Sequence, residues 1–448
     1  MKRFIDTFRH IWSIQELRDK ILLTLGLLLV YRLGSNVVLP GIDPNSLAQL
    51  QNQASEGLIG ILNAFSGGAF ANASVLALGI MPYISSSILI QLLGLAVPAV
   101  QKMQKDGESG RRKLNQITRY LTIAVALAQA PGYITNLMMQ GVQLTLPTGA
   151  FWSLALLTLT AGTIFAMWLG ERITEKGIGN GISLLIMIGI IATLPQAFLQ
   201  ELVNQISPSG GGWVVFLLEI VALYLVIMFA IAITQAVRKI PLEYAKRVAG
   251  AKSDSAPRTI GRSYLPIRIN TAGVMPIIFA QALMFIPLTV MQYAGATGES
   301  ATWFITVFGN IQGFWYNFVF ATLIVVFTYF YTAIQINTTQ IADDLKRSGG
   351  FVPGVKPGAD TAEYIETILA RITLPGSILL AAVAILPSVA MKANMTMQWA
   401  NFFGGTSLLI MVGVILDTLM QIESYLLNSH YDGLLEGGRV KGRNATGM

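Results

Sequence analysis

The chain contains no cysteine and carries little charge for its length. The absence of Cys among 448 residues excludes disulfides, thiolate catalysis and cysteine-bound metals. The only two histidines, His10 and His430, lie near opposite ends of the sequence, so we expect no metal site, and no motif indicates another cofactor. Charged residues make up 12% of the chain, compared with about 25% in soluble proteins, and long blocks lack them. This pattern excludes a soluble enzyme and predicts a polytopic membrane protein.

Motifs for catalysis are also missing. No G-x-x-x-x-G-K-[ST] phosphate loop is present, so we expect no nucleotide hydrolysis. Residues 177–181, reading G-I-G-N-G, resemble such a loop only superficially, and a turn that begins a helix is the favoured interpretation. The acids Glu219 and Asp417 fall within apolar runs, where we expect polar interhelical contacts or interface positions rather than a proton pathway. The apolar runs contain no aligned carboxylate pair and no Ser–His pair, which argues against an intramembrane enzyme.

Ten apolar runs, each able to form a helix across roughly 30 Å of hydrocarbon, follow one another along the chain. They cover approximately residues 21–38, 73–96, 116–139, 150–169, 181–199, 213–234, 265–291, 314–337, 368–391 and 402–422. We therefore predict an all-α polytopic membrane protein with ten transmembrane helices.

The basic residues indicate the orientation, because Lys and Arg in short loops stay on the cytoplasmic side. With both termini inside, 28 of the 30 Lys and Arg residues fall in inner segments, and only Arg32 and Lys392 do not. This asymmetry predicts a multi-pass membrane protein with both termini in the cytoplasm. It also explains the formal net charge of +7 without nucleic acid.

Two inner loops, residues 235–264 and 338–367, are long, polar and rich in Lys and Arg. They are either solvated loops that fix the topology or a docking platform for a cytoplasmic partner. Between predicted spans five and six, residues 206–212 read I-S-P-S-G-G-G, a composition typical of a flexible connector. This connector divides the chain into an N-terminal half, 1–205, and a C-terminal half, 213–448, of five spans each. The span count favours two pseudo-symmetric halves hinged at the connector.

Residues 57–71 are uncharged, interrupted by Gly67 and Gly68, and too short to span before the next apolar run. Such a break at membrane depth is tolerated only where it faces protein or water. The segment is either a re-entrant half-helix dipping in from the outer side or an interfacial surface helix, and its composition leaves both open.

Several long motifs occur in one order along the chain. They are A-L-G-I-M-P-Y-I-S-S-S-I-L-I-Q-L-L at 77–93, P-G-I-D at 40–43, F-S-G-G at 65–68, K-D-G-E-S-G-R-R-K at 105–113, M-W-L-G-E-R-I-T-E-K-G-I-G-N-G-I-S from 167, N-T-A-G-V-M-P-I-I-F-A from 270, G-G-F-V-P-G-V-K-P-G from 349 and F-G-G-T-S-L-L-I from 403. In order, spacing and topology, about residues 15–435 resemble the SecY family of protein-translocating channels.

The resemblance implies an hourglass-shaped channel with a waist of aliphatic side chains. The matching positions are Ile80, Ile84, Ile182, Ile186, Ile278 and Ile410. A narrow apolar constriction dewets and resists ions, yet it forms no strong bonds to a passing peptide. Taken singly, each isoleucine would be interpreted as an ordinary core or lipid-facing residue.

The resemblance also assigns residues 57–71 to a plug helix that seats against the ring from outside, with Phe65, Ser66, Gly67 and Gly68 in its motif. It implies a lateral gate between spans two and seven, through which hydrophobic segments leave for the lipid. The matching polar positions are Gln91, Gln129 and Asn270. Interhelical bonds between such amides contribute only about 0.6–2 kcal/mol, so a seam of this kind can open.

Partners are implied as well: SecE-like and SecG-like small membrane subunits, the SecA motor ATPase or the ribosome at the cytoplasmic face, and preproteins with their signal sequences. The docking positions implied are Arg247, Lys346, Arg347 and Lys356. Lys356 stands where many bacterial members of the family carry Arg, and lysine lacks the planar bidentate fork of a guanidinium.

A secondary transporter for a small solute is the alternative, since ten spans with proline-broken helices and an inverted repeat suit that class too. A transporter site needs charged or densely polar groups near mid-membrane, whereas the predicted waist is aliphatic. The sequence therefore favours a passive protein-conducting channel that translocates unfolded preproteins, inserts hydrophobic segments laterally into the membrane, and is driven by an external motor or ribosome.

Overall fold

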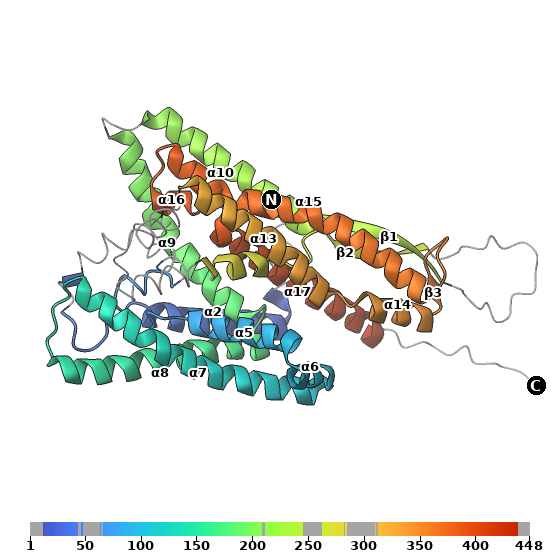
Figure 1. Cartoon of the computed structure of the whole chain (residues 1–448), viewed down its shortest axis with the longest axis horizontal. Helices are drawn as coiled ribbons and strands as arrows, with labels where there is room; N and C mark the ends of the chain where they lie inside the picture. Colours follow the sequence, from blue (N-terminus) through green and yellow to red (C-terminus); the bar gives the residue numbers. More distant parts are fainter. Residues whose placement is uncertain are drawn as a thin grey trace, which may run out of the picture. The chain divides into compact units, whose positions relative to one another are not determined.

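The computed structural model describes residues 12–43, 46–47, 63, 66–207, 211–244, 262–281, 283–284, 310 and 312–437. Within these ranges the chain is mostly helical, with three short strands (Figure 1). In chain order the elements are α2 Gln15–Gly34, α5 Met81–Ala96, α6 Pro98–Lys105, α7 Gly107–Met139, α8 Thr148–Lys176, α9 Gly181–Ile206, α10 Gly212–Gln235, β1 Val237–Tyr244, β2 Arg262–Arg268, α13 Phe314–Gln335, α14 Thr338–Arg347, β3 Gly350–Phe351, α15 Ala359–Lys392, α16 Met397–Ala400 and α17 Gly405–Gly437.

Seven of the described helices are long and apolar enough to cross a membrane, or up to eight if the bent pair Met81–Gly94 and Pro98–Gln104 forms one span. They match predicted spans three to six and eight to ten, and the bent pair lies at span two. Helix α2 occupies the first predicted span, and the seventh lies partly outside the described residues. The predicted all-α polytopic class is confirmed, and the count of ten is consistent with these helices.

Two predicted spans begin later than expected. Residues 66–80 form turns and α5 begins only at Met81, because Ala73 and Gly79 adopt positive φ angles of 43° and 51° that end any helix before them. The start predicted at residue 265 was likewise wrong: residues up to 268 lie in β2, and helical structure begins at Met275.

The chain forms two compact units, Met1–Pro195 with Val414–Met448, and Gln196–Gly413. These divisions fall inside α9 and α17, whereas the connector predicted at residues 206–212 belongs wholly to the second unit. Of that connector, residues 208–210 lie outside the described residues.

The core of the first unit joins chain segments that precede α5 to α7 and α8, which pack side by side (Figure 1). Its buried members include Leu39 and Ala73 from the segments, Ile134 from α7, and Phe151 and Leu159 from α8. The segments are joined by a backbone hydrogen bond from Leu39 N to the Ala73 carbonyl, 2.8 Å. Apolar burial thus holds an irregular stretch of chain against two long helices.

In the second unit the described parts of the two long loops, residues 235–244, 262–264 and 338–367, contain strands and a helix. β1 pairs antiparallel with β2 and β3, in the sheet order β2-β1-β3, and α14 packs against β3 and α15. A separate hydrophobic cluster supports them: Ile240, Leu242, Ile267, Leu345, Val352, Ile365 and Leu369. The described parts of both loops therefore share one hydrophobic core.

A buried polar cluster stabilises the corner between α9 and α10, also in the second unit. The Gln205 amide donates to Glu201 Oε1 at 2.7 Å and to Glu219 Oε1 at 2.9 Å, and its oxygen accepts from Gly211 N at 3.0 Å. Glu201 Oε2 accepts from Thr396 N at 2.8 Å. The interhelical contact predicted for Glu219 is confirmed, and the end of the connector is bonded to α9.

We expect Gln205→Leu to lower the thermal unfolding temperature of the purified chain. Two buried carboxylates lose a hydrogen-bond donor, and each loss destabilises the fold by about 1–3 kcal/mol. Gln200→Leu, the same change at an exposed position of α9, is the control and should leave it unchanged. Equal unfolding temperatures for the two variants would contradict the role given to this amide.

Candidate functional site

The turns at residues 66–80 carry part of the predicted plug and lead to the predicted waist. Gly68 N donates to Asn63 O at 2.9 Å, and Ala71 N donates to Asn63 Oδ1 at 2.9 Å. Tyr133 of α7 donates from its hydroxyl to Phe70 O at 2.8 Å, and the two rings meet edge-on with centroids 4.7 Å apart. The described plug residues are thus held by their own turn and by α7. Phe65 lies outside the described residues.

Two close backbone approaches hold the same segment inside the first unit. A Cβ at Gly67, whose φ is 66°, would lie 2.6 Å from the Cα of Gly189 in α9. A Cβ at Gly162 in α8 would lie 2.2 Å from the carbonyl oxygen of Val75. Both separations are far below van der Waals contact, so only glycine fits at either position.

Four of the six predicted waist isoleucines belong to the first unit, in two pairs four residues apart. Ile80 and Ile84 stand at the start of α5, where Ile84 N donates to Ile80 O at 3.1 Å. Ile182 and Ile186 lie in the first two turns of α9. A spacing of four places each pair on one helix face. Ile80 and Ile186 are 4% and 5% exposed, whereas Ile84 and Ile182 are half-buried.

The other two predicted waist residues belong to the second unit. Ile278 is half-buried in the helical stretch that begins at Met275, and Ile410, in the first turns of α17, is 4% exposed. In both units, the predicted waist isoleucines lie near the start of a helix. The complete ring stays a prediction.

The glycine loop at residues 177–181 is closed by protein acceptors. Ile178 N donates to Thr24 Oγ1 of α2 at 3.0 Å, and Gly179 N donates to Gln421 Oε1 of α17 at 2.9 Å. Gly181 N donates to Thr174 Oγ1 at 2.9 Å, while Asn180 Oδ1 accepts from the first turn of α9. These amides already have partners, whereas a phosphate loop needs free ones. The helix-entry interpretation is the one that the geometry supports.

The three amides predicted for the gate differ in their surroundings. Gln91 of α5 donates to Ser87 Oγ at 3.3 Å, and Gln129 of α7 is exposed. Asn270, in the second unit, is 6% exposed, and its buried Oδ1 has no hydrogen-bond partner among the described residues. The seam itself remains a prediction.

The folded loops of the second unit present basic side chains. Lys346 and Arg347, in the last turn of α14, are exposed, as is Lys356 after β3. Arg238 and Lys239 on β1 are also exposed and were not singled out by sequence. Arg247 lies outside the described residues. Exposed cations grouped on a helix, a strand and a turn of one unit are suited to binding an anionic macromolecular surface.

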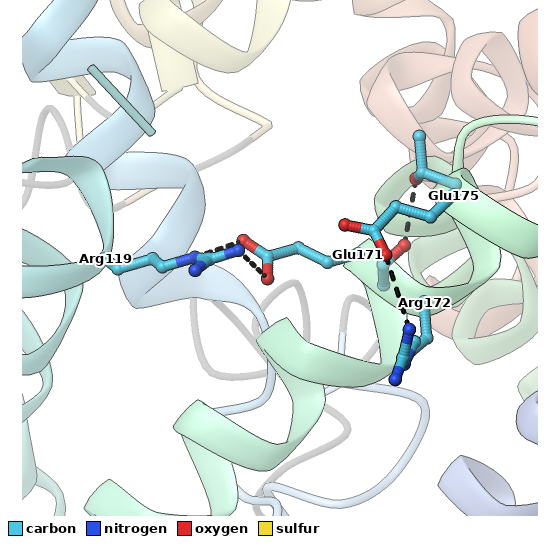
Figure 2. A network of polar contacts seen from close by, with 6 residues as sticks. Arg119, Glu171, Arg172 and Glu175 are labelled. Carbon is cyan, nitrogen blue, oxygen red and sulfur yellow. Dashed lines mark hydrogen bonds and ion pairs between the residues drawn. The ribbon is translucent and has the colours of Figure 1, made fainter. Parts of the chain in front are cut away.

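An ion-pair network between α7 and α8 was missed by sequence reasoning. Arg119 donates from Nε and Nη2 to the two carboxylate oxygens of Glu171, at 2.8 and 2.7 Å, and Figure 2 shows this fork. Arg172 pairs with Glu175 one turn further along α8, at 3.5 Å. The E-R-I-T-E run at residues 171–175 was the only sequence signal for this network. It does not identify Arg119 as the partner of Glu171, because the two residues are 52 positions apart.

Comparisons with known proteins identify a family for this chain. Residues 74–419 match the SecY family model. The chain is 39% identical over 443 residues to the protein translocase subunit SecY of Streptomyces scabiei, covering 96% of this chain and 100% of the relative. It is 41% identical over 436 residues to that of Escherichia coli K12, covering 96% of each.

Solved structures share the fold. The structure described as that of a protein-conducting channel matches with a TM-score of 0.62 at 16% identity over 94% of both chains. Sec61 in the canine ribosome–channel complex matches with a TM-score of 0.59 at 15% identity, also over 94% of both.

We expect Gly162→Ala to destabilise the first unit by about 1–3 kcal/mol, because the added methyl group collides with the Val75 carbonyl. Thermal unfolding of the purified chain measures this effect. Gly26→Ala on α2, where nothing lies within 4 Å of the new Cβ, is the matched control and should be neutral or stabilising. Unchanged stability of the Gly162 variant would show that the segment shifts freely.

Proposed function

This chain belongs to the SecY family of protein translocase subunits, and from that premise we propose how its residues carry a polypeptide across a membrane. As a multi-pass subunit of a protein-conducting channel, it provides the path for unfolded preproteins. The membrane is proposed to be the cell inner membrane, with both termini cytoplasmic, since 28 of 30 basic residues fall in predicted inner segments.

The observation that carries the proposed pore is the pairing of aliphatic side chains at helix starts beside an irregular segment. Ile80 and Ile84 begin α5, Ile182 and Ile186 begin α9, and the turns at 66–80 lie within the same unit. Side chains of this type repel water and ions without binding a passing peptide. Ile278 and Ile410 complete the proposed ring, and the segment at 57–71 acts as the plug that closes it.

Lateral release is proposed along the seam between spans two and seven. The buried Oδ1 of Asn270 has no hydrogen-bond partner among the described residues. This supports the assignment, because an amide at a seam that opens must be able to exchange one hydrogen-bond partner for another. Opening is proposed to occur between the predicted halves 1–205 and 213–448, about the connector at 206–212.

The channel is proposed to be passive, because the sequence has no nucleotide motif and the backbone amides of Ile178, Gly179 and Gly181 are already bonded. Its energy then comes from a SecA-like motor or a ribosome docked on the folded loops, where Lys346, Arg347 and Lys356 are exposed. The ribosome is supported by two structural relatives that are described as bound to one. SecE-like and SecG-like subunits are proposed to complete the complex.

The test is reconstitution of this chain with SecE-like and SecG-like subunits in liposomes, with a SecA-like motor, ATP and a labelled preprotein. Protease protection that requires both ATP and this chain is the expected result. If active partners give no protection, the proposed function fails and uptake of small solutes becomes the next assay.

If Ile278 and Ile410 line the waist, Ile278→Asn and Ile410→Asn should raise ion leak through the reconstituted complex several-fold, because an amide favours wetting of a narrow apolar constriction. Both should also relax the requirement for a functional signal sequence. Ile415→Asn, at an exposed position on α17, is the control. Leak equal to that of the parent would remove either residue from the ring.

A further inference from the structure

Arg32 has an unusual position for a charged residue. It is one of only two basic residues placed outside the predicted inner segments, and it lies near the C-terminal end of α2, half-buried. Among the described residues it forms no ion pair with a carboxylate. A guanidinium near hydrocarbon is costly and is retained where it has a specific partner.

The partner of Arg32 is the backbone of the predicted plug. Its Nη1 donates a short hydrogen bond to the carbonyl oxygen of Gly67, and the same nitrogen lies 3.3 Å from Ser35 Oγ. Ser35 is 1% exposed and donates to the Arg32 carbonyl at 2.7 Å, which orders the end of α2. The guanidinium thus reaches across from α2 to the S-G-G turn, 35 residues away.

Gly67 is also closely approached by α9. Its φ of 66° sets the direction of the turn, and the Cα of Gly189 in α9 leaves no space for a side chain there. Arg32 and Gly189 therefore contact one residue from two different helices of the same unit. Of these contacts only the one from Arg32 is a charge-assisted hydrogen bond, which is roughly twice as strong as a neutral bond.

We propose that Arg32 is the positioning residue that holds residues 66–71, the described end of the predicted plug segment, in a seated conformation, through the Gly67 carbonyl. This inference rests on the proposed function, and within it Arg32 acts as a latch that one side chain can release. Because its acceptor is a neutral carbonyl, release leaves no buried carboxylate unpaired, and Ser35 Oγ remains within reach of the guanidinium. Loss of the latch should therefore favour the open plug without unfolding the unit.

The experiment uses the absence of cysteine. Ala69→Cys places one thiol at a position that is 0% exposed, two residues after Gly67, and its rate of labelling by a membrane-impermeant maleimide in the reconstituted complex reports how often the segment leaves its seat. In this background we expect Arg32→Gln to raise the rate roughly tenfold, equivalent to about 1.4 kcal/mol. Arg32→Lys, which keeps the charge but loses the planar fork, should give a smaller increase.

Two controls separate the latch from general stability. Arg18→Gln removes a guanidinium from the other end of α2 and should leave labelling unchanged. Ala155→Cys, 1% exposed in α8, reports unfolding of the unit and should stay unlabelled in the Arg32 variants. Labelling of Ala69→Cys within twofold of the parent rate in Arg32→Gln, or an equal rise at both cysteines, would overturn the proposal.

The same complexes separate this proposal from the one on which it rests. If the Ala69→Cys parent with Arg32 intact protects preprotein while Arg32→Gln leaves labelling unchanged, the latch fails and the channel stands. If the original chain fails to protect preprotein with active partners, the proposed function itself fails.

Discussion

Backbone N–H and C=O groups that a helix does not pair need other partners, and the rest of this structure depends on how that requirement is met where the chain is not helical. At residues 66–80 the partners are Asn63, Tyr133 and the neighbouring turns. At residues 177–181 they are Thr24, Thr174 and Gln421, from three different helices. Both stretches lead directly into helices that begin with the predicted waist isoleucines, so the bonding of the turns decides where those side chains stand.

Close approach of backbones makes such segments compact without strong bonds. Gly67 meets Gly189, and Gly162 meets the Val75 carbonyl, at distances that no Cβ permits. Such contacts pack the backbones closely. They include no hydrogen bond that would have to break if the segment moved away. This combination suits the plug movement that we propose, and the proposed latch at Arg32 adds one charge-assisted hydrogen bond to it.

In the second unit, the described parts of two long loops share one core. The two long loops would be solvated chain if each were alone, but Ile240 and Leu242 from one and Leu345 and Val352 from the other bury each other against α15. The exposed cations Arg238 and Lys239 lie on β1, and Lys346 and Arg347 lie on α14, which packs against β3. The connector between α9 and α10 is likewise bonded to Gln205 through Gly211, which limits its freedom at that end.

Much of the fold could be read from the sequence, because length, apolarity and the placement of Lys and Arg are local properties that a bilayer constrains strongly. The helical class, most spans, the contact at Glu219 and the helix-entry turn at 177–181 were all predictable in this way. The late start of α5 was not, since it depends on positive φ angles at Ala73 and Gly79 that only packing imposes.

The candidate site divides along the same line. Six isoleucines and three amides could be named from motifs, because residue type and register are written along the chain. Their burial could not be predicted in this way. Nor could the bond from Arg32 to Gly67 or the pairing of Arg119 with Glu171, which join residues 35 and 52 positions apart. By itself the sequence determined which segments enter the membrane and which residues are available. Only the tertiary structure decided which of them meet, because hydrogen bonds and close packing act between neighbours in space, whatever their separation along the chain.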